Sequence, residues 1–253
     1  MGLSTTGDDE PGGALAGLES LYVESERPTE IDWGALEFHD VFKIYRSGPA
    51  ETVALRGLDL RIEPGEMAAI VGPSGSGKST VLALAAAMDT PSAGEVRALE
   101  RSLAGLGETA LADYRAREIA IVFQSDNLWP ALSARENVAT VLRLAGQSDA
   151  ENAASEALEG FGLADRQHLR PSALSGGEQQ RVAIAAAAAG RARLVLADEP
   201  TGELDERNEA IVLEALHELR DVYGSTILVV THADRVAGAC DRVVSVRDGK
   251  VEA

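Results

Sequence analysis

The sequence predicts an α/β fold with a mostly parallel sheet, a small antiparallel β part and a helical insertion. The runs RLVLA (193–197) and TILVV (226–230) are nearly all apolar, which is typical of parallel strands covered on both faces. Between the strand-like run IAIVF (119–123) and RLVLA lies a stretch, from about 134 to 189, whose composition favours helices. Alternating strands and helices around such an insertion indicate a layered α/β domain.

The N-terminal residues differ in composition from the rest of the chain. Residues 1–33 are acidic, contain several Gly and Pro, and carry one basic residue, Arg27. We therefore expect a mobile acidic tail, with a weak helix near Leu15–Leu21. The predicted domain spans residues 34–253, with a helical subdomain at about 125–190.

The overall composition excludes several classes of protein. The formal net charge of −18 disfavours non-specific binding to nucleic acid or to anionic lipid. The single cysteine, Cys240, excludes an internal disulfide framework and a multi-cysteine metal site. No apolar run approaches the length of about 20 residues that a membrane-spanning helix needs. A secretory signal is not expected, because the N-terminus lacks a basic region followed by an apolar one.

Short strands are predicted at the front of the domain. ALEFHDVFKIY (35–45) and LDLRIEPGEMAAIVG (58–72) both favour strands, and the Pro64–Gly65 turn divides the second. The run AAIV at the end of this segment leads into a helix that we expect to begin after Lys78.

The glycine-rich segment GPSGSGKST is the strongest local signal. It fits the pattern G-x-x-x-x-G-K-[ST], and it follows an apolar strand and opens a helix, as phosphate binding requires. Its glycines let successive backbone amides point at the α- and β-phosphates of a nucleotide. Lys78 is expected to reach the β- and γ-phosphates, and the Ser79 hydroxyl to bind Mg²⁺. The segment predicts a P-loop NTPase core with these nucleotide-binding residues: Gly72, Pro73, Ser74, Gly75, Ser76, Gly77, Lys78, Ser79 and Thr80.

Polar residues follow three other predicted strands. Asp198 ends the run LVLAD and Glu199 comes directly after it, His232 ends TILVVTH, and Gln124 follows IAIVF. The carboxyl ends of parallel strands meet at one edge of a sheet, so these side chains are expected near the γ-phosphate. Asp198 would hold Mg²⁺, Glu199 would activate the attacking water, and Gln124 would offer a neutral oxygen to Mg²⁺ or water.

A second glycine-rich helix start lies in the segment SALSGGEQQRVAIAAAAAG (172–190). Ser175 and Glu178 have the spacing of a capping box, which satisfies the free amides of a first helical turn. Capping does not explain Gly176 and Gly177, because glycine in a helix costs conformational entropy. Bare amides at the positive end of a helix are suited to binding an anion.

Together these residues resemble the nucleotide-binding subunit of an ABC transporter, over about Leu36 to Val251. The resemblance rests on one ordered set: Tyr45, GPSGSGKST, Gln124, LSGGEQQR, LADEPTGELD and His232. The segments VALRGLDLRIEPGE, FQSDNLWPALSARENV and RPSALSGGEQQRVAIA resemble the ATPases of the lipoprotein-release and macrolide-export type.

The resemblance implies roles that the residues alone do not. Tyr45 would stack on adenine, Glu199 would be the general base, and His232 would be the γ-phosphate switch. Ser175, Gly176, Gly177 and Glu178 would face the ATP of a second copy of the chain, and Asp205 would contact that copy.

The resemblance also implies partners. Two copies would close around two ATP, with Mg²⁺, and would power a separate integral membrane permease from the cytoplasmic face of the membrane. An alternative is an ATPase that controls an external cell-wall enzyme through a permease-like partner, without transport. Nucleic acid is not an expected partner. The segment 125–138 would touch the coupling helix of the permease, and its Leu128, Trp129 and Leu132 suit either that contact or the local core.

The sequence departs from the family pattern at several positions. Ala186 stands where the family usually has Arg, and Ala192 where it has Pro. Glu203 adds a negative charge in the loop before Asp205, and Glu100–Arg101 replace an expected glycine turn. None of these positions belongs to the predicted hydrolytic core, so we expect an active enzyme.

Overall fold

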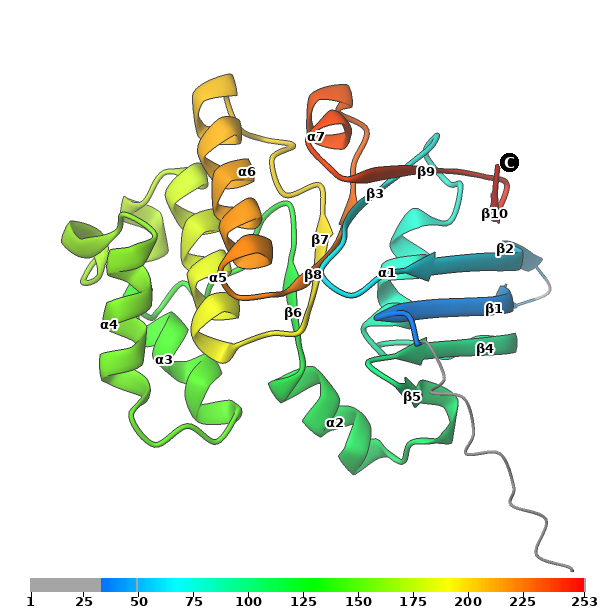
Figure 1. Ribbon diagram of the computed structural model, residues 1–253, viewed down its shortest axis with the longest axis horizontal. Helices are drawn as coiled ribbons and strands as arrows, with labels where there is room; N and C mark the ends of the chain where they lie inside the picture. The colour runs from blue at the N-terminus through cyan, green and yellow to red at the C-terminus, as the bar shows by residue number, and fades with distance from the viewer. Residues whose placement is uncertain (1–32, 49, 253) are drawn as a thin grey trace, which may run out of the picture. The chain divides into compact units, whose positions relative to one another are not determined.

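A computed structural model of the chain describes residues 33–48 and 50–252. The predicted tail, apart from its last residue, and the weak helix near Leu15–Leu21 lie outside the described residues. Two sheets carry the domain (Figure 1).

The first sheet has four antiparallel strands in the order β2-β1-β4-β5. Alternating apolar residues of β1 and β2, such as Leu36 and Ile62, pair across the long hairpin and face the core. The strands are β1 (Leu36–Ser47), β2 (Ala50–Ile62), β4 (Ala93–Ala98) and β5 (Arg101–Ser102).

The second sheet has six strands in the order β10-β9-β3-β8-β7-β6, parallel except for the short pair β9–β10. Every residue of β8 is buried, as its nearly all-apolar sequence predicts. The P-loop and the polar residues Asp198, Glu199 and His232 follow the carboxyl ends of its central strands. The strands are β3 (Met67–Val71), β6 (Ile119–Val122), β7 (Leu194–Asp198), β8 (Thr226–Val230), β9 (Arg242–Arg247) and β10 (Lys250–Val251).

The helices pack on both sheets and on one another. α3, α4 and α5 lie together at one end of the domain, and α6 lies beside α5 (Figure 1). The helices are α1 (Lys78–Ala85), α2 (Glu108–Arg117), α3 (Ala134–Leu144), α4 (Ala150–Gly160), α5 (Gly176–Gly190), α6 (Glu206–Asp221) and α7 (Asp234–Gly238). None of the helices in the described residues is long and apolar enough to cross a membrane.

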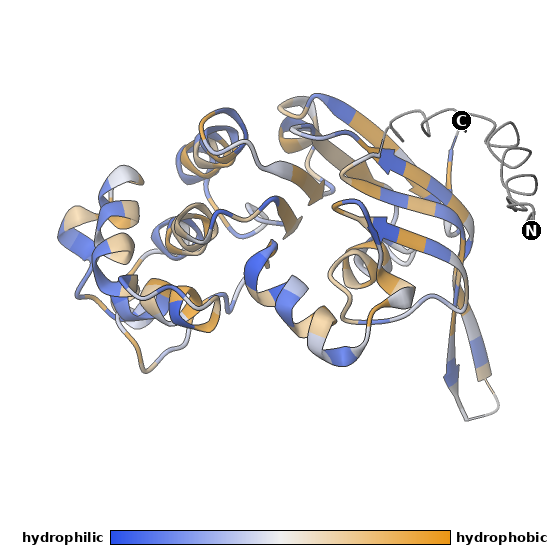
Figure 2. Ribbon diagram, turned by 60° about the horizontal axis from the view of Figure 1, so that its bottom comes forward, coloured by the Kyte–Doolittle hydropathy of each residue, from blue (hydrophilic) through white to orange (hydrophobic). Residues whose placement is uncertain are grey.

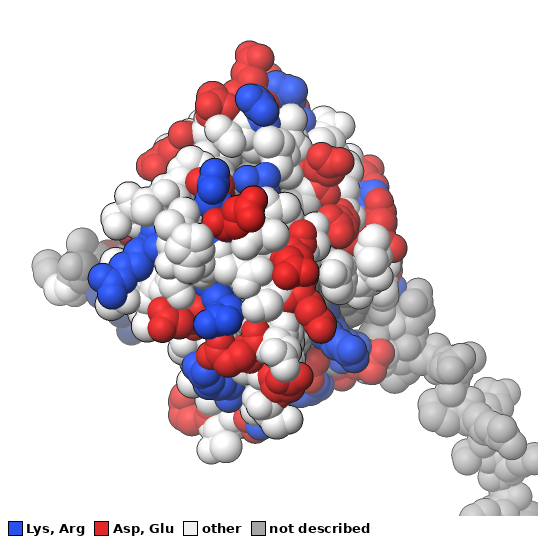
Figure 3. Space-filling model, turned by 90° about the vertical axis from the view of Figure 1, so that its left-hand side faces the viewer, with Lys and Arg blue, Asp and Glu red and all other residues white. Residues whose placement is uncertain are grey.

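Apolar side chains form two buried clusters on these elements. One joins β1, β2 and β4 to α1, and the other joins α3–α6 to β7 and β8. Figure 2 shows apolar residues alternating with polar ones along the strands of the antiparallel sheet. On the face nearest α4, acidic and basic side chains are interspersed (Figure 3).

The turn that replaces the expected glycine lies one residue earlier than predicted. Leu99 and Glu100 occupy it, with φ of 50° and 67°, while Arg101 already pairs in β5. Two consecutive left-handed residues give the tight turn that a β-hairpin favours, where Asn and Gly are the usual choices. Leu99 is nevertheless buried, which offsets part of the backbone strain by apolar contact.

Candidate functional site

A cavity of about 1050 Å³ opens at the carboxyl ends of β3, β6, β7 and β8. Most of the polar residues that the sequence predicts for nucleotide binding line this cavity. Its lining comprises Gly72, Ser74, Gly75, Gly77, Lys78, Ser79, Thr80, Gln124, Asp198, Glu199 and His232. Residues that sequence reasoning missed complete it: Thr52, Val53, Ala54, Phe123, Ser125, Asp126 and Val230.

The P-loop has a backbone that only glycine permits at two positions. Gly72 and Gly77 have φ of 150° and 105°. A Cβ at Gly77 would lie 2.6 Å from the carbonyl oxygen of Ala54, and one at Gly72 would collide with that of Val246. Both glycines therefore allow the loop to curl closely against neighbouring backbone.

The start of α1 leaves its polar groups available to a ligand. Gly77, the residue before α1, supplies no side-chain cap, and the first turn contains no acidic residue. The Lys78 ammonium donates to the carbonyl oxygens of Gly72 and Pro73, at 2.8 and 3.0 Å. The hydroxyl of Ser76 is buried without a hydrogen-bond partner. Free amides, a positive charge and an unpaired hydroxyl fit a polyphosphate.

Asp198 and Ser79 face each other across the cavity floor. Burial raises the pKa of Asp198, and the adjacent Glu199 charge raises it further, against a hydrogen bond from Ser79 and the charge of Lys78. A divalent cation between these two side chains would relieve the cost of burying the carboxylate. The described residues contain no group of three or more His, Cys, Asp or Glu that could hold a metal ion. Mg²⁺ bound with a nucleotide also takes oxygen ligands from phosphate and water.

Glu199 and His232 form a hydrogen-bonded pair beside Asp198. The His232 Nδ1 lies 2.7 Å from Glu199 Oε1, and the His232 amide donates to Oε2 at 3.3 Å. Glu199 has φ of 48°, a left-handed conformation that few residues other than glycine adopt. Its amide donates to the carbonyl oxygen of Val230 on the neighbouring strand, which holds the backbone in place.

A buried glutamine on α5 fixes the loop that carries Gln124. The Gln180 side chain is 3% exposed, and its Nε2 donates to the carbonyl oxygens of Phe123 and Gln124 at 2.8 and 2.7 Å. Its Oε1 accepts from Asn127 Nδ2 at 2.9 Å. Gln180 lies in the motif LSGGEQQR, but nothing in the sequence indicates its partner 56 residues away.

The structure does not bring Tyr45 into the cavity lining. Its ring lies 4.9 Å below the Lys43 ammonium, and Tyr45 also bonds to Asp89. Thr52, which pairs with Tyr45 across the hairpin, does line the cavity. The adenine-stacking role of Tyr45 therefore stays a prediction.

The start of α5 lies apart from the cavity lining and is capped within the chain. The Ser175 hydroxyl accepts from the Glu178 amide at 3.2 Å, and a Glu178 carboxylate oxygen accepts from the Ser175 amide at 2.8 Å. These bonds make the capping box that the sequence predicts. The bond from the Ser175 amide is the largest of the effects that lower the pKa of Glu178, and Arg166 adds to them at 2.8 Å.

The glycines of this second helix start differ from each other. Gly176 is exposed, whereas Gly177 is buried. A Cβ at Gly177 would lie 2.7 Å from Asn208 Oδ1, and Asn208 donates to Asp205, the residue that caps α6. Intrachain packing is thus a reason for Gly177 that sequence reasoning missed.

Comparison with known proteins shows which family the chain belongs to. The model of the ABC transporter family matches residues 55–202. The chain is 43% identical to an ABC transporter ATP-binding protein of Thermotoga maritima, over 86% of this chain and 93% of that protein. It is 44% identical to the lipoprotein-releasing system ATP-binding protein LolD of Koribacter versatilis, over 83% of this chain and 95% of LolD.

Two further comparisons concern the length of a relative and the fold of this chain. The chain is 44% identical to the macrolide export ATP-binding/permease protein MacB of an Azoarcus species, over 91% of this chain but only 36% of MacB. It superimposes, with a TM-score of 0.79, on one chain of the ATP-binding cassette MJ0796 in a dimeric structure of a post-hydrolysis state bound to ADP and Pi. The two chains are 37% identical, and the superposition covers 86% of this chain and 97% of the MJ0796 chain. The predicted α/β P-loop NTPase fold is confirmed. The chain belongs to the ABC transporter family, as an ATPase subunit of the type that LolD and MacB represent.

Proposed function

We propose that two copies of this chain close head to tail around two ATP and drive a separate integral membrane permease from the cytoplasmic side. In each site the P-loop of one copy and the Gly176 and Gly177 amides of the other would hold the same nucleotide. The observation that carries the proposal is the cavity in which Lys78, Glu199 and His232 converge.

The hydrolytic step follows from the positions of these side chains. Glu199 accepts a proton from the water that attacks the γ-phosphorus in line, and the bond from that phosphorus to the bridging oxygen breaks, releasing ADP and phosphate. His232, whose Nδ1 lies 2.7 Å from Glu199 Oε1, fixes the direction of the carboxylate and would contact the γ-phosphate. Ser79, Gln124 and Asp198 would hold Mg²⁺, which would supply positive charge to neutralise the β- and γ-phosphates.

Two features support a second copy in the complete site. The exposed Gly176 lies outside the cavity of its own chain, with its backbone amide at a helix start. The relative MJ0796 cassette is dimeric with ADP and Pi bound. A membrane partner is supported by the names of relatives, since LolD belongs to a lipoprotein-releasing system and MacB joins an ATP-binding part to a permease.

The variant Glu199→Gln tests the proposal. It retains the shape of the side chain and a hydrogen bond to His232 but cannot accept the proton. We expect turnover to fall at least about 100-fold, within the range that a general base contributes. The same variant should accumulate as an ATP-dependent dimer in sedimentation velocity.

The wild-type chain provides the matching measurement. Its specific ATPase activity should rise with subunit concentration, because each active site needs both copies. Activity of Glu199→Gln close to that of wild type, or specific activity independent of concentration, would contradict the proposal.

A further inference from the structure

The start of α5 combines free backbone amides with a negatively charged side chain. The amides of Gly176 and Gly177 donate no hydrogen bond within the part of the chain that the structure describes. The Glu178 carboxylate lies at the same helical turn, where its Oε2 accepts from the Ser175 amide at 2.8 Å. The free amides favour a bound anion, whereas the carboxylate repels one.

A single arginine neutralises this carboxylate from outside the helix. Arg166 ends the short helical turn Ala164–Arg166 that precedes α5, and its Nε lies 2.8 Å from Glu178 Oε1. No other Lys or Arg of the described residues lies within ion-pair distance of Glu178. The Glu178 side chain is 18% exposed, so water alone screens its charge only in part.

The charge of Glu178 is present whenever a nucleotide approaches. Its two carboxylate oxygens have separate partners, because Oε2 accepts from the Ser175 amide and Oε1 from Arg166. The Ser175 amide contributes most to lowering the pKa of Glu178, and the bond and charge of Arg166 add to the effect against burial. Glu178 is therefore ionised at neutral pH, and Arg166 is the group that compensates its charge.

The capping box of α3 has no such compensation. Ser133 and Glu136 make the same two bonds there, but no Lys or Arg of the described chain forms an ion pair with Glu136. A capping box therefore does not need an arginine in order to form. The arginine at α5 accompanies the one of these two helix starts that has glycine amides free for a ligand.

The ion pair itself adds little to the stability of the fold. The Arg166 side chain is 48% exposed, and ion pairs that solvent reaches contribute little to the free energy of unfolding. The bonds between Ser175 and Glu178 already fix the start of the helix. We therefore expect the main effect of Arg166 on the charge at the α5 start rather than on folding.

We propose that Arg166 is a positioning residue for the ATP-dependent dimer, because it neutralises Glu178 beside the free amides of α5. With that carboxylate neutralised, the amides accept the phosphates that the P-loop of the second copy holds. The proposal rests on the proposed function, which places the nucleotide of a second copy at α5. Arg166 does not line the nucleotide cavity of its own chain, so it acts on the nucleotide through Glu178.

The Glu199→Gln protein allows the dimer to be measured directly, since it is expected to hold ATP without hydrolysing it. Sedimentation velocity with ATP and Mg²⁺ gives its dimer dissociation constant. Adding Arg166→Gln should weaken the dimer at least about tenfold, because an uncompensated carboxylate then faces the phosphates at each site. A fluorescent ATP analogue should bind the monomer with affinity within about twofold of the parent, since the P-loop is unchanged.

A second substitution separates charge from structure. Glu178→Gln keeps the capping box, in which Gln serves as Glu does, and removes the negative charge. The protein with both Arg166→Gln and Glu178→Gln should regain a dimer within about threefold of the parent, although it has no ion pair. If the pair only held the preceding loop in place, this protein would dimerise as weakly as Arg166→Gln alone.

Arg143→Gln is the matched control for net charge. Arg143 pairs with Glu151 between α3 and α4, its side chain is partly exposed like that of Arg166, and it does not line the nucleotide cavity. The change removes the same charge from the chain, so the dimer should stay within about twofold of the parent. Thermal unfolding of every variant checks the fold.

The possible failures are distinguishable. Full dimerisation of the Arg166→Gln protein, absence of rescue by Glu178→Gln, or an equal loss in the Arg143→Gln protein would each overturn the role of Arg166 alone. Failure of the parent Glu199→Gln protein to dimerise with ATP would contradict the proposed function, and the role of Arg166 with it.

Discussion

The chain has two glycine-rich helix starts, and the two are built differently. In the proposed dimer, one start from each copy meets the same nucleotide. α1 begins without any side-chain cap, and its Lys78 folds back onto carbonyl oxygens of its own loop. α5 begins with a complete capping box from Ser175 and Glu178, which Arg166 reinforces. The start of α1 thus leaves its hydrogen-bond donors to the ligand, whereas the start of α5 already has its cap within the chain.

This difference indicates that the two helix starts have different roles in nucleotide binding. An uncapped helix start gains most from a bound anion, because several free amides and the helix dipole act together. A capped start is stable before any nucleotide arrives, and only its exposed amides remain for a second molecule. α5 therefore acts as a preformed surface, whereas the P-loop is completed by its ligand.

Removing the positive charge at the uncapped start should have the largest effect. Lys78→Met keeps the aliphatic stem and removes the ammonium, so ATP affinity measured by calorimetry should fall at least about 100-fold, or ~3 kcal/mol. Thermal unfolding without nucleotide should change little, because the ammonium bonds only to loop carbonyls. ATP affinity within threefold of wild type would show that the amides alone hold the phosphates.

The two glycines of α5 separate packing from ligand access. Gly177→Ala forces a Cβ against Asn208, so we expect the free energy of unfolding to fall by about 1–2 kcal/mol, even though alanine favours a helix. Gly176→Ala meets only the flexible end of Leu204, at 3.1 Å, so its stability should stay within about 0.5 kcal/mol. Urea unfolding without nucleotide compares them.

ATPase assays of the same pair complete the test. Gly176→Ala should lower activity at least about tenfold, since its Cβ would obstruct the approach of the nucleotide held by the second copy. Full activity of Gly176→Ala would refute the idea that bare amides at α5 serve that nucleotide.

Removing the cap itself should have the smallest effect. Ser175→Ala should cost about 1 kcal/mol of unfolding free energy, measured by thermal unfolding. α3 offers a matched control, because Ser133 and Glu136 form the same capping box there. Ser133→Ala should cost a similar amount and leave ATPase activity unchanged. A Ser175→Ala protein as stable as wild type would mean that α5 does not depend on its cap.

Local sequence was enough to predict most of the fold and the centre of the cavity. The apolar strands, the P-loop, and Asp198, Glu199 and His232 at strand ends depend on patterns within about ten residues, so they could be identified without coordinates. The predicted helical stretch contains α3, α4 and α5.

Other features depend on contacts between residues far apart in the chain. The bonds of Gln180 to the Gln124 loop, the fit of Gly177 against Asn208 and the position of Tyr45 beside Lys43 are fixed only by tertiary packing. The turn at Leu99 was misplaced because neither Leu nor Glu favours a left-handed backbone.

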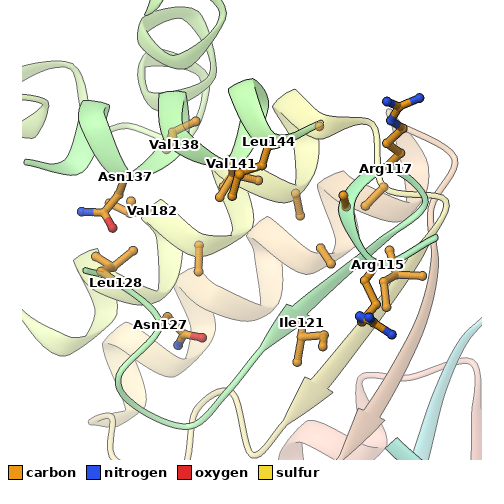
Figure 4. Close-up of a pocket in the computed structure, with 18 of the residues that line it drawn as sticks. Arg115, Arg117, Ile121, Asn127, Leu128, Asn137, Val138, Val141, Leu144 and Val182 are labelled. Carbon is orange, nitrogen blue, oxygen red and sulfur yellow. The ribbon is translucent and has the colours of Figure 1, made fainter. Parts of the chain in front are cut away.

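The Asn127 side chain connects a second pocket of the molecule with the loop that carries Gln124. It lines that pocket, of about 530 Å³, between α2, β6, α3 and α5 (Figure 4), and it also bonds to Gln180, which holds the backbone of Gln124. A molecule bound in that pocket that displaces Asn127 would therefore change the free energy of nucleotide binding, and the nucleotide would change the affinity of that molecule by the same factor.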